Sequence, residues 1–136
     1  ALARRVHVYE VRIADGATPD IRPRTTFGAT DGPGALHMVE SIAVDAAHDQ
    51  VLVAEEDARA GQVLKVYRRD GRWTGTNIGT DRYAYQPEGV ALYACPDGSG
   101  WWVASDQHEV GQRYLVFARG SLDYVGAFRG RHVRMT

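Results

Sequence analysis

The sequence predicts an all-β protein built from repeated, antiparallel four-stranded units. Two consecutive parts of the chain follow the same order of short strand-like runs, which are rich in β-branched and aromatic residues. Turn-forming sequences such as Asp70-Gly71 and Pro96-Asp97-Gly98 separate these runs. No stretch shows a sustained helical period with a cap at both ends. Four strands in a repeat of about 40 to 50 residues are typical of a β-propeller blade.

The repeat consists of three pairs of matching segments. The pairs are 39–44 (VESIAV) with 87–92 (PEGVAL), 50–57 (QVLVAEED) with 100–107 (GWWVASDQ), and 61–67 (GQVLKVY) with 111–117 (GQRYLVF). Arg69 and Arg119 continue the last pair. The second and third strands of the two copies are therefore predicted to match at an offset of 50 residues.

The expected strands lie at matching places in the two copies. They span about 41–46, 50–55, 62–68 and 73–78 in the first copy and about 89–94, 100–105, 113–118 and 123–128 in the second. In the N-terminal third, 6–12 resembles a third strand and 24–27 a short fourth strand. The predicted divisions are a partial blade with its connection over 1–37, blades over 38–85 and 86–130, and the start of a further connection over 131–136.

About ten strands amount to two and a half blades, whereas propellers close with about four to eight blades. Because a blade buries its faces only against neighbouring blades, we expect the missing blades to come from the same chain or another chain. The sequence starts at Ala1 without a signal-peptide pattern, which is what we expect of a processed or excised chain. A four-stranded sandwich variant is the structural alternative.

Composition and charge argue against several classes of function. The formal net charge of −1 gives no reason to expect binding to nucleic acid or to an anionic membrane. Apolar runs are too short for a transmembrane helix. Cys95 is the single cysteine, so the chain can form neither an internal disulfide nor a cysteine metal cluster. The five histidines are scattered, without the spacing of close metal ligands.

Acidic residues fall at matching points of the two copies. Glu40 and Glu88 each stand just before the first expected strand of their copy. The innermost strand of a blade lines the central channel, so these two glutamates should converge on one rim from adjacent blades. The second strands end in the acidic or amide-bearing runs 55–57 (EED) and 105–107 (SDQ).

Carboxylates gathered without interleaved lysine or arginine repel one another unless a cation neutralises them. Oxygen ligands of this kind, with an amide from Gln107, suit Ca²⁺ and its six to eight oxygen ligands. The alternative interpretation is that these acids are simply solvated in loops. The repeat pattern alone leaves both interpretations open.

Several motifs together resemble the blades of β-propeller phytases. They are 53–57 (VAEED), 86–93 (QPEGVALY), 102–107 (WVASDQ) and 124–129 (YVGAFR), and the likeness runs from about 38 to 130. The resemblance implies a six-bladed propeller that holds several Ca²⁺ ions on its channel rim. It also implies a secreted, extracellular or periplasmic 3-phytase-like phosphatase that hydrolyses a phosphorylated small molecule such as phytate by a metal-activated water.

Carried over residue by residue, the resemblance makes Glu40, Glu56 and Glu88 calcium ligands and Gln107 a site glutamine. Glu55 and Asp57 belong to the same motif and are further candidate metal ligands. On this basis, the predicted catalytic residues are Glu40, Glu88 and Gln107. Two positions depart from the family pattern, because Ser41 and His108 stand where the family usually has glycine.

Three functions remain open at this point. The first is a fragment of a phytase-like phosphomonoester hydrolase, which we expect to be inactive by itself because half of the site is missing. The second is another propeller hydrolase of the lactonase or esterase kind, which needs only one metal ion. The third is a non-catalytic propeller module for binding, in which the carboxylates hold no metal.

Overall fold

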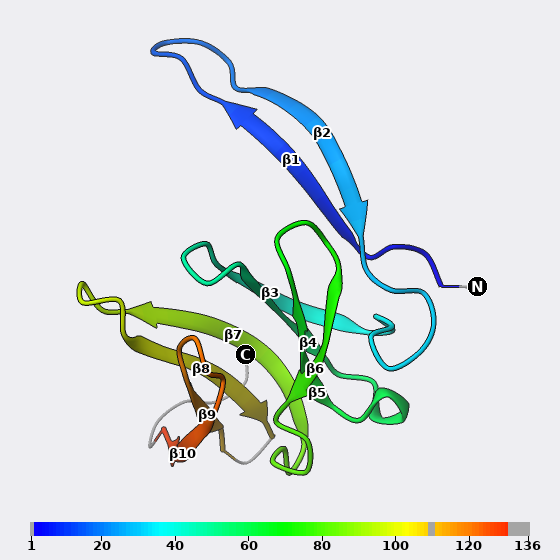
Figure 1. The fold of residues 1–136 in the computed structure, drawn as a ribbon, viewed down its shortest axis with the longest axis vertical. Helices are drawn as coiled ribbons and strands as arrows, with labels where there is room; N and C mark the ends of the chain where they lie inside the picture. Colours follow the sequence, from blue (N-terminus) through cyan, green and yellow to red (C-terminus); the bar gives the residue numbers. More distant parts are fainter. Residues whose placement is uncertain (1, 109–110, 131–136) are drawn as a thin grey trace.

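The computed structural model describes residues 2–108 and 111–130, which form two four-stranded sheets and a separate hairpin (Figure 1). The strands are β1 Val6–Arg12, β2 Asp20–Phe27, β3 Val39–Asp45, β4 Gln50–Glu55, β5 Val63–Tyr67, β6 Trp73–Ile78, β7 Gln86–Ala94, β8 Gly100–Gln107, β9 Arg113–Ala118 and β10 Tyr124–Arg129. A single 3₁₀ turn, η1 Ala58–Ala60, is the only helical element in these ranges. None of the described helices is long and apolar enough to cross a membrane.

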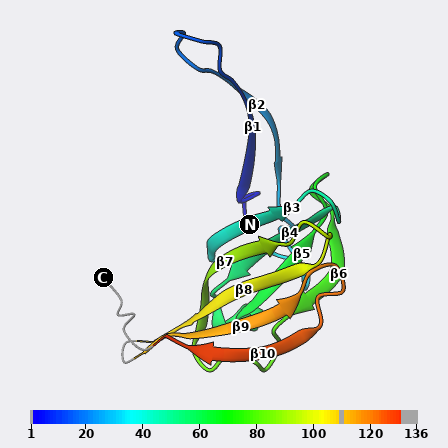
Figure 2. The ribbon, with the colours of Figure 1, turned by 90° about the vertical axis from the view of Figure 1, so that its left-hand side faces the viewer.

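Each four-stranded sheet is an antiparallel meander. The strand orders are β3-β4-β5-β6 and β7-β8-β9-β10, and β1 pairs only with β2. The prediction of an all-β fold with antiparallel four-stranded units is therefore confirmed, and the sheets have the strand order of propeller blades. In Figure 2 the hairpin β1–β2 extends away from the two stacked sheets.

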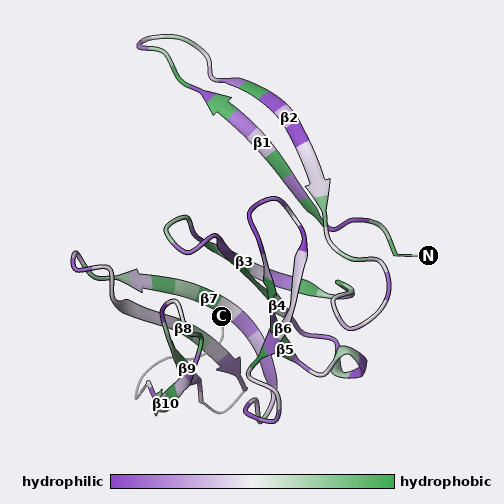
Figure 3. Cartoon of the chain, viewed as in Figure 1, coloured by the Kyte–Doolittle hydropathy of each residue, from purple (hydrophilic) through white to green (hydrophobic). Residues whose placement is uncertain are grey.

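The central strands β4 and β5 of the β3–β6 sheet are buried on both faces, and successive side chains along each strand point to opposite faces. Leu52 and Ala54 of β4 join a core that includes Trp102 and Leu115 of the other sheet. The opposite face packs in a second core against the segment that follows the hairpin; this core consists of Phe27, Leu36, Val51, Val53 and Tyr67. The alternation is also visible as green and purple segments along β1 (Figure 3).

The strand pairing corrects one part of the predicted register. Ile42 pairs with Val53 in the first sheet, and Val90 pairs with Ala104 in the second. The first strands, β3 and β7, therefore match at an offset of 48 residues, but the second strands match at 51 rather than 50. Glu55 is thus equivalent to Asp106, not to Ser105.

Unequal loop lengths cause this shift. The connection between the first and second strands spans 46–49 in the first sheet but the equivalent 94–100 in the second. The next connection spans 56–62 in the first sheet and the shorter 107–112 in the second, which restores the 50-residue offset in the third strands. The difference in length of one connection partly cancels that of the other. The offset of the second strands therefore cannot be found by counting residues along the chain.

An ion pair joins the two sheets at the end of β3. Asp45 is 1% exposed, and the Arg119 guanidinium donates to its Oδ1 and Oδ2 at 2.8 and 2.6 Å. His48 Nδ1 lies 2.8 Å from the same Oδ2. Hydrogen bonding by Arg119 outweighs burial and holds the pKa of Asp45 well below its ordinary value of 3.8.

This low pKa predicts a specific loss of stability in acid. Because folding depresses the pKa of Asp45, its contribution is fully present above the ordinary value of 3.8 and is lost as the pH falls towards the folded pKa. We expect the melting temperature of the Asp45→Asn variant to fall less than that of the wild type between about pH 6 and pH 2. Parallel curves for the two proteins would contradict this assignment.

Candidate metal centre

Glu40 and Glu88 lie at β-bulges in β3 and β7, the first strands of the two sheets. In β3 the pairing passes from Val39–Glu55 to Ser41–Ala54, so Glu40 is the extra residue. In β7 the pairing likewise shifts between Pro87 and Val90, beside Glu88. Because a bulge re-aims side chains, the two glutamates depart from the ordinary alternation of their strands.

Glu56 completes a group of three carboxylates. It follows directly after β4, and its backbone N–H donates to Met38 O at 2.9 Å. One carboxylate oxygen from each of Glu40, Glu56 and Glu88 lies within 4.8 Å of the others. Glu40 is exposed, and the other two are half-buried. The structure therefore brings these three predicted ligands together, from both sheets.

The electrostatics of this group are unfavourable without a cation. Burial raises the pKa of Glu56 above its ordinary value of 4.5, and the hydrogen bond to Glu40 and the negative charges of Glu40, Glu88 and Glu55 raise it further. Every one of these contributions disfavours the carboxylate form. The surroundings of Glu56 therefore make its negative charge less favourable than in water, and a bound cation would offset this cost.

Gln107 lies beside Glu88. With its amide nitrogen turned towards this carboxylate, Gln107 donates to Glu88 Oε1 at 2.6 Å and to Oε2 at 2.9 Å. Gln86, which the sequence analysis did not single out, also donates to Glu88 Oε1 at 3.5 Å. In the corrected register Gln107 is the equivalent of Glu56, so the same place in each sheet contributes to the site.

Glu55 and Asp57 have other partners. The buried Glu55 carboxylate accepts hydrogen bonds from the backbone N–H groups of His37, Met38 and Asp57. Asp57 caps η1 and pairs with Arg59. These contacts do not favour the two residues as metal ligands, and that role stays a prediction.

The two departures from the family pattern also find contacts in the structure. Ser41 Oγ accepts a hydrogen bond from Val90 N at 3.2 Å and so links the bulged regions of the two sheets. The His108 ring packs against the Tyr85 ring with centroids 3.7 Å apart and a tilt of 30°. Both rings line a hollow of about 390 Å³, together with Arg113 and Arg129. A serine at position 41 is therefore compatible with the site.

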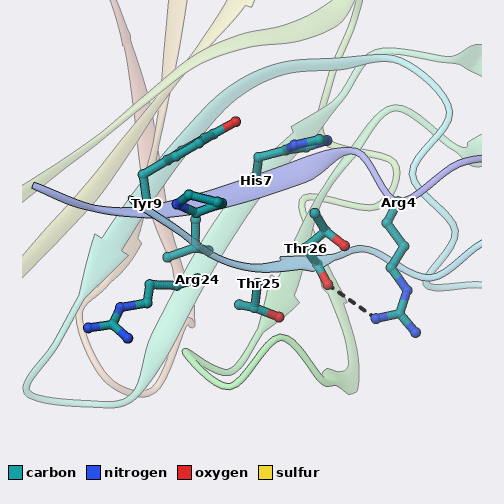
Figure 4. Close-up of a pocket in the computed structure, with 8 residues that line it drawn as sticks. Arg4, His7, Tyr9, Arg24, Thr25 and Thr26 are labelled. Atoms are coloured by element: carbon teal, nitrogen blue, oxygen red, sulfur yellow. Dashed lines mark hydrogen bonds between the residues drawn. The ribbon is translucent and has the colours of Figure 1, made fainter. Parts of the chain in front are cut away.

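A second hollow of about 490 Å³ lies on the hairpin, lined by Arg4, His7, Val8, Tyr9, Pro23, Arg24, Thr25 and Thr26 (Figure 4). The Arg4 guanidinium donates to Thr26 O at 3.1 Å. Arg24 pairs with Glu10 of the neighbouring strand, and Arg22 pairs with Asp20. The arginine residues of β2 thus form ion pairs within the hairpin itself.

A protein-family model described as Phytase matches residues 35–134. This range contains both four-stranded sheets and every predicted site residue. A search of the curated proteins found no match to the chain.

Proposed function

Because the chain belongs to the phytase family, we propose that the full-length protein hydrolyses phosphate monoesters of phytate with the help of Ca²⁺ bound at Glu40, Glu56 and Glu88. The single observation that carries the proposal is the convergence of these three carboxylates from equivalent regions of two sheets. The family match supplies the substrate class, which is a phosphorylated small molecule.

The residues present fit a calcium ion. Hard carboxylate oxygens are the ligands that Ca²⁺ prefers, and three of them already lie close together. Burial first, and then the nearby acids, raise the pKa of Glu56, and a divalent cation bound here would offset this cost of its negative charge. The histidines and the single cysteine form no group with these acids in the described residues, so the donor set is one of oxygen atoms.

The proposed reaction gives these residues two tasks. Glu40, Glu56 and Glu88 hold the ion, and Gln107 fixes the Glu88 carboxylate through its amide. Bound calcium would activate water as a nucleophile and offset the negative charge of the phosphoryl group. Since the other parts of such a site would lie on further blades, the isolated chain is expected to be inactive.

The proposal includes those further blades. The β7–β10 sheet leaves large apolar side chains exposed, among them Tyr93, Trp101 and Phe128. A blade of a repeat architecture buries such a face against its neighbour. We therefore place the segments 38–85 and 86–130 as blades of a six-bladed propeller and 1–37 as part of a third blade. Residues 131–136 lie outside the described part of the chain.

The test measures phosphate release from phytate by the full-length protein. We expect release in millimolar Ca²⁺ and its loss on chelation, because the ion both activates water and neutralises the three carboxylates. Localisation outside the cytoplasm, in the medium or periplasm, is part of the same proposal and can be followed in cell fractions.

Other outcomes would favour the alternative functions. Hydrolysis of lactones or esters with a single bound ion would replace the proposal with a lactonase- or esterase-like function. A calorimetric titration of the full-length protein that shows no Ca²⁺ binding would favour a non-catalytic binding module. Release of phosphate that is insensitive to chelation would contradict the calcium requirement.

A further inference from the structure

The two bulges are supported in the same way by a buried acid. Glu55 Oε2 accepts the N–H of His37 at 2.6 Å, and Glu55 Oε1 accepts the N–H of Met38 at 2.7 Å. In the second sheet, Asp106 accepts the N–H groups of Ala84 and Tyr85 at 3.0 and 2.9 Å. Both acidic residues are 0% exposed. Each therefore binds two consecutive backbone N–H groups just before an innermost strand.

The corrected register shows that these acids occupy equivalent positions. Glu55 pairs with Val39, the residue before Glu40, and Asp106 pairs with Pro87, the residue before Glu88. The hydrogen-bonded segments, 37–38 and 84–85, differ in sequence. The shared feature is therefore the carboxylate and its place in the pairing, and not the residue type around it.

The contacts of Glu55 explain why it is unsuited to a direct role at the ion. Its Oε1 also accepts the N–H of Asp57 at 3.1 Å, so both oxygens are already engaged by the backbone. Asp106 is likewise engaged, since Arg113 donates to its Oδ2 at 2.6 and 2.9 Å. A buried carboxylate that accepts several hydrogen bonds is fixed in orientation and fixes its donors in return.

A bulge interrupts the regular ladder of a sheet, so the residues beside it need other contacts to hold one conformation. Groups that orient the ligands of a metal ion commonly affect how tightly the site binds the ion, although they do not contact the ion themselves. We propose that Glu55 and Asp106 are positioning residues, which anchor the start of β3 and β7 and thereby aim Glu40 and Glu88 at a shared cation. This inference rests on the proposed function.

The test compares Glu55→Gln and Asp106→Asn with the wild type in the full-length protein. An amide keeps the size of the side chain but turns an NH₂ group towards one of the two backbone donors, so one hydrogen bond is lost. The matched control is Asp45→Asn, which changes an equally buried acid at the other end of β3. Calcium binding is measured by titration calorimetry, and backbone mobility by hydrogen exchange in the absence of calcium.

We expect both anchor variants to raise the Kd for Ca²⁺ by about 10- to 100-fold. The number of bound ions should stay the same, and excess Ca²⁺ should restore phosphate release. Hydrogen exchange should quicken at 37–38 in Glu55→Gln and at 84–85 in Asp106→Asn, each without effect on the other segment. Asp45→Asn should lower the melting temperature and leave the Kd unchanged.

Three results would overturn the inference. An unchanged Kd in both anchor variants would show that these acids stabilise the fold only. Loss of a bound ion in Glu55→Gln, without recovery in excess Ca²⁺, would make Glu55 a ligand. A wild-type protein that binds no Ca²⁺ would overturn the proposed function together with this inference, whereas an unchanged Kd beside normal wild-type binding overturns the inference alone.

Discussion

Replacing Glu56 with Gln is expected to remove most calcium-dependent phosphate release and, at the same time, to stabilise the calcium-free protein. Activity should fall by about 100-fold or more, since a lost ligand costs at least as much as a lost orienting group. The expected gain in stability of the calcium-free variant follows from the raised pKa of Glu56. Because folding raises the pKa of Glu56, its carboxylate form lowers the stability of the folded, calcium-free protein once the pH rises above the ordinary value of 4.5.

Melting curves at neutral pH, recorded with a chelator and with saturating Ca²⁺, check this prediction. The variant should melt above the wild type in the chelator and gain less from Ca²⁺. Glu10→Gln is the matched control, because it removes the same charge from an acid that pairs with Arg12 on the hairpin. Equal responses of Glu56→Gln and the control to Ca²⁺ would exclude Glu56 from the site.

Replacing Trp102 with Ala should cost about 3 to 5 kcal/mol of unfolding free energy. Trp102 is 0% exposed and lies in the core between the two sheets, so its removal leaves a cavity at the contact that holds Glu40 and Glu88 together. Its indole N–H finds no acceptor in the described part of the chain. The loss is therefore one of packing, and Trp102→Phe should cost less than Trp102→Ala.

Denaturant unfolding of the full-length protein measures both variants. The Trp101→Ala variant tests the opposite face of β8, on which Trp101 is 41% exposed. A small cost at Trp101 would mean that this face stays open, and a cost similar to that of Trp102 would mean that another sheet covers it. A cost below about 1 kcal/mol at Trp102 would contradict its place in the core.

The sequence predicted the repeated four-stranded unit because strand patterning and turn residues are local signals. The repeat pattern singled out Glu40 and Glu88 at equivalent places of the two copies, and the resemblance to the phytases added Glu56. The structure brings one carboxylate oxygen of each of the three within 4.8 Å of the others. The offset of the second strands could not be predicted, because it depends on two loops whose length differences partly cancel. That error hid the equivalence of Glu55 with Asp106, and hence the support that both give to the bulges.

The role of Glu55 shows a second limit of sequence reasoning. Glu55 and Glu56 are neighbours of the same residue type, and only the strand pairing shows which one turns to the backbone of 37–38 and which one joins the other carboxylates. A bulge breaks the simple alternation on which such a choice would rest. The sequence also placed the start of one hairpin strand too late, because β2 begins at Asp20 and not at the predicted residue 24.

The longer connection over 94–100 has a practical consequence for engineering this protein. It lies at the opposite end of β7 from Glu88, and it accommodates three more residues than its equivalent in the first sheet without disturbing the pairing around the bulge. The length of this turn can therefore differ between the two sheets while the pairing beside the bulge is kept. Cys95, a partly exposed free thiol within it, offers a ready attachment point for a fluorescent label remote from the carboxylates.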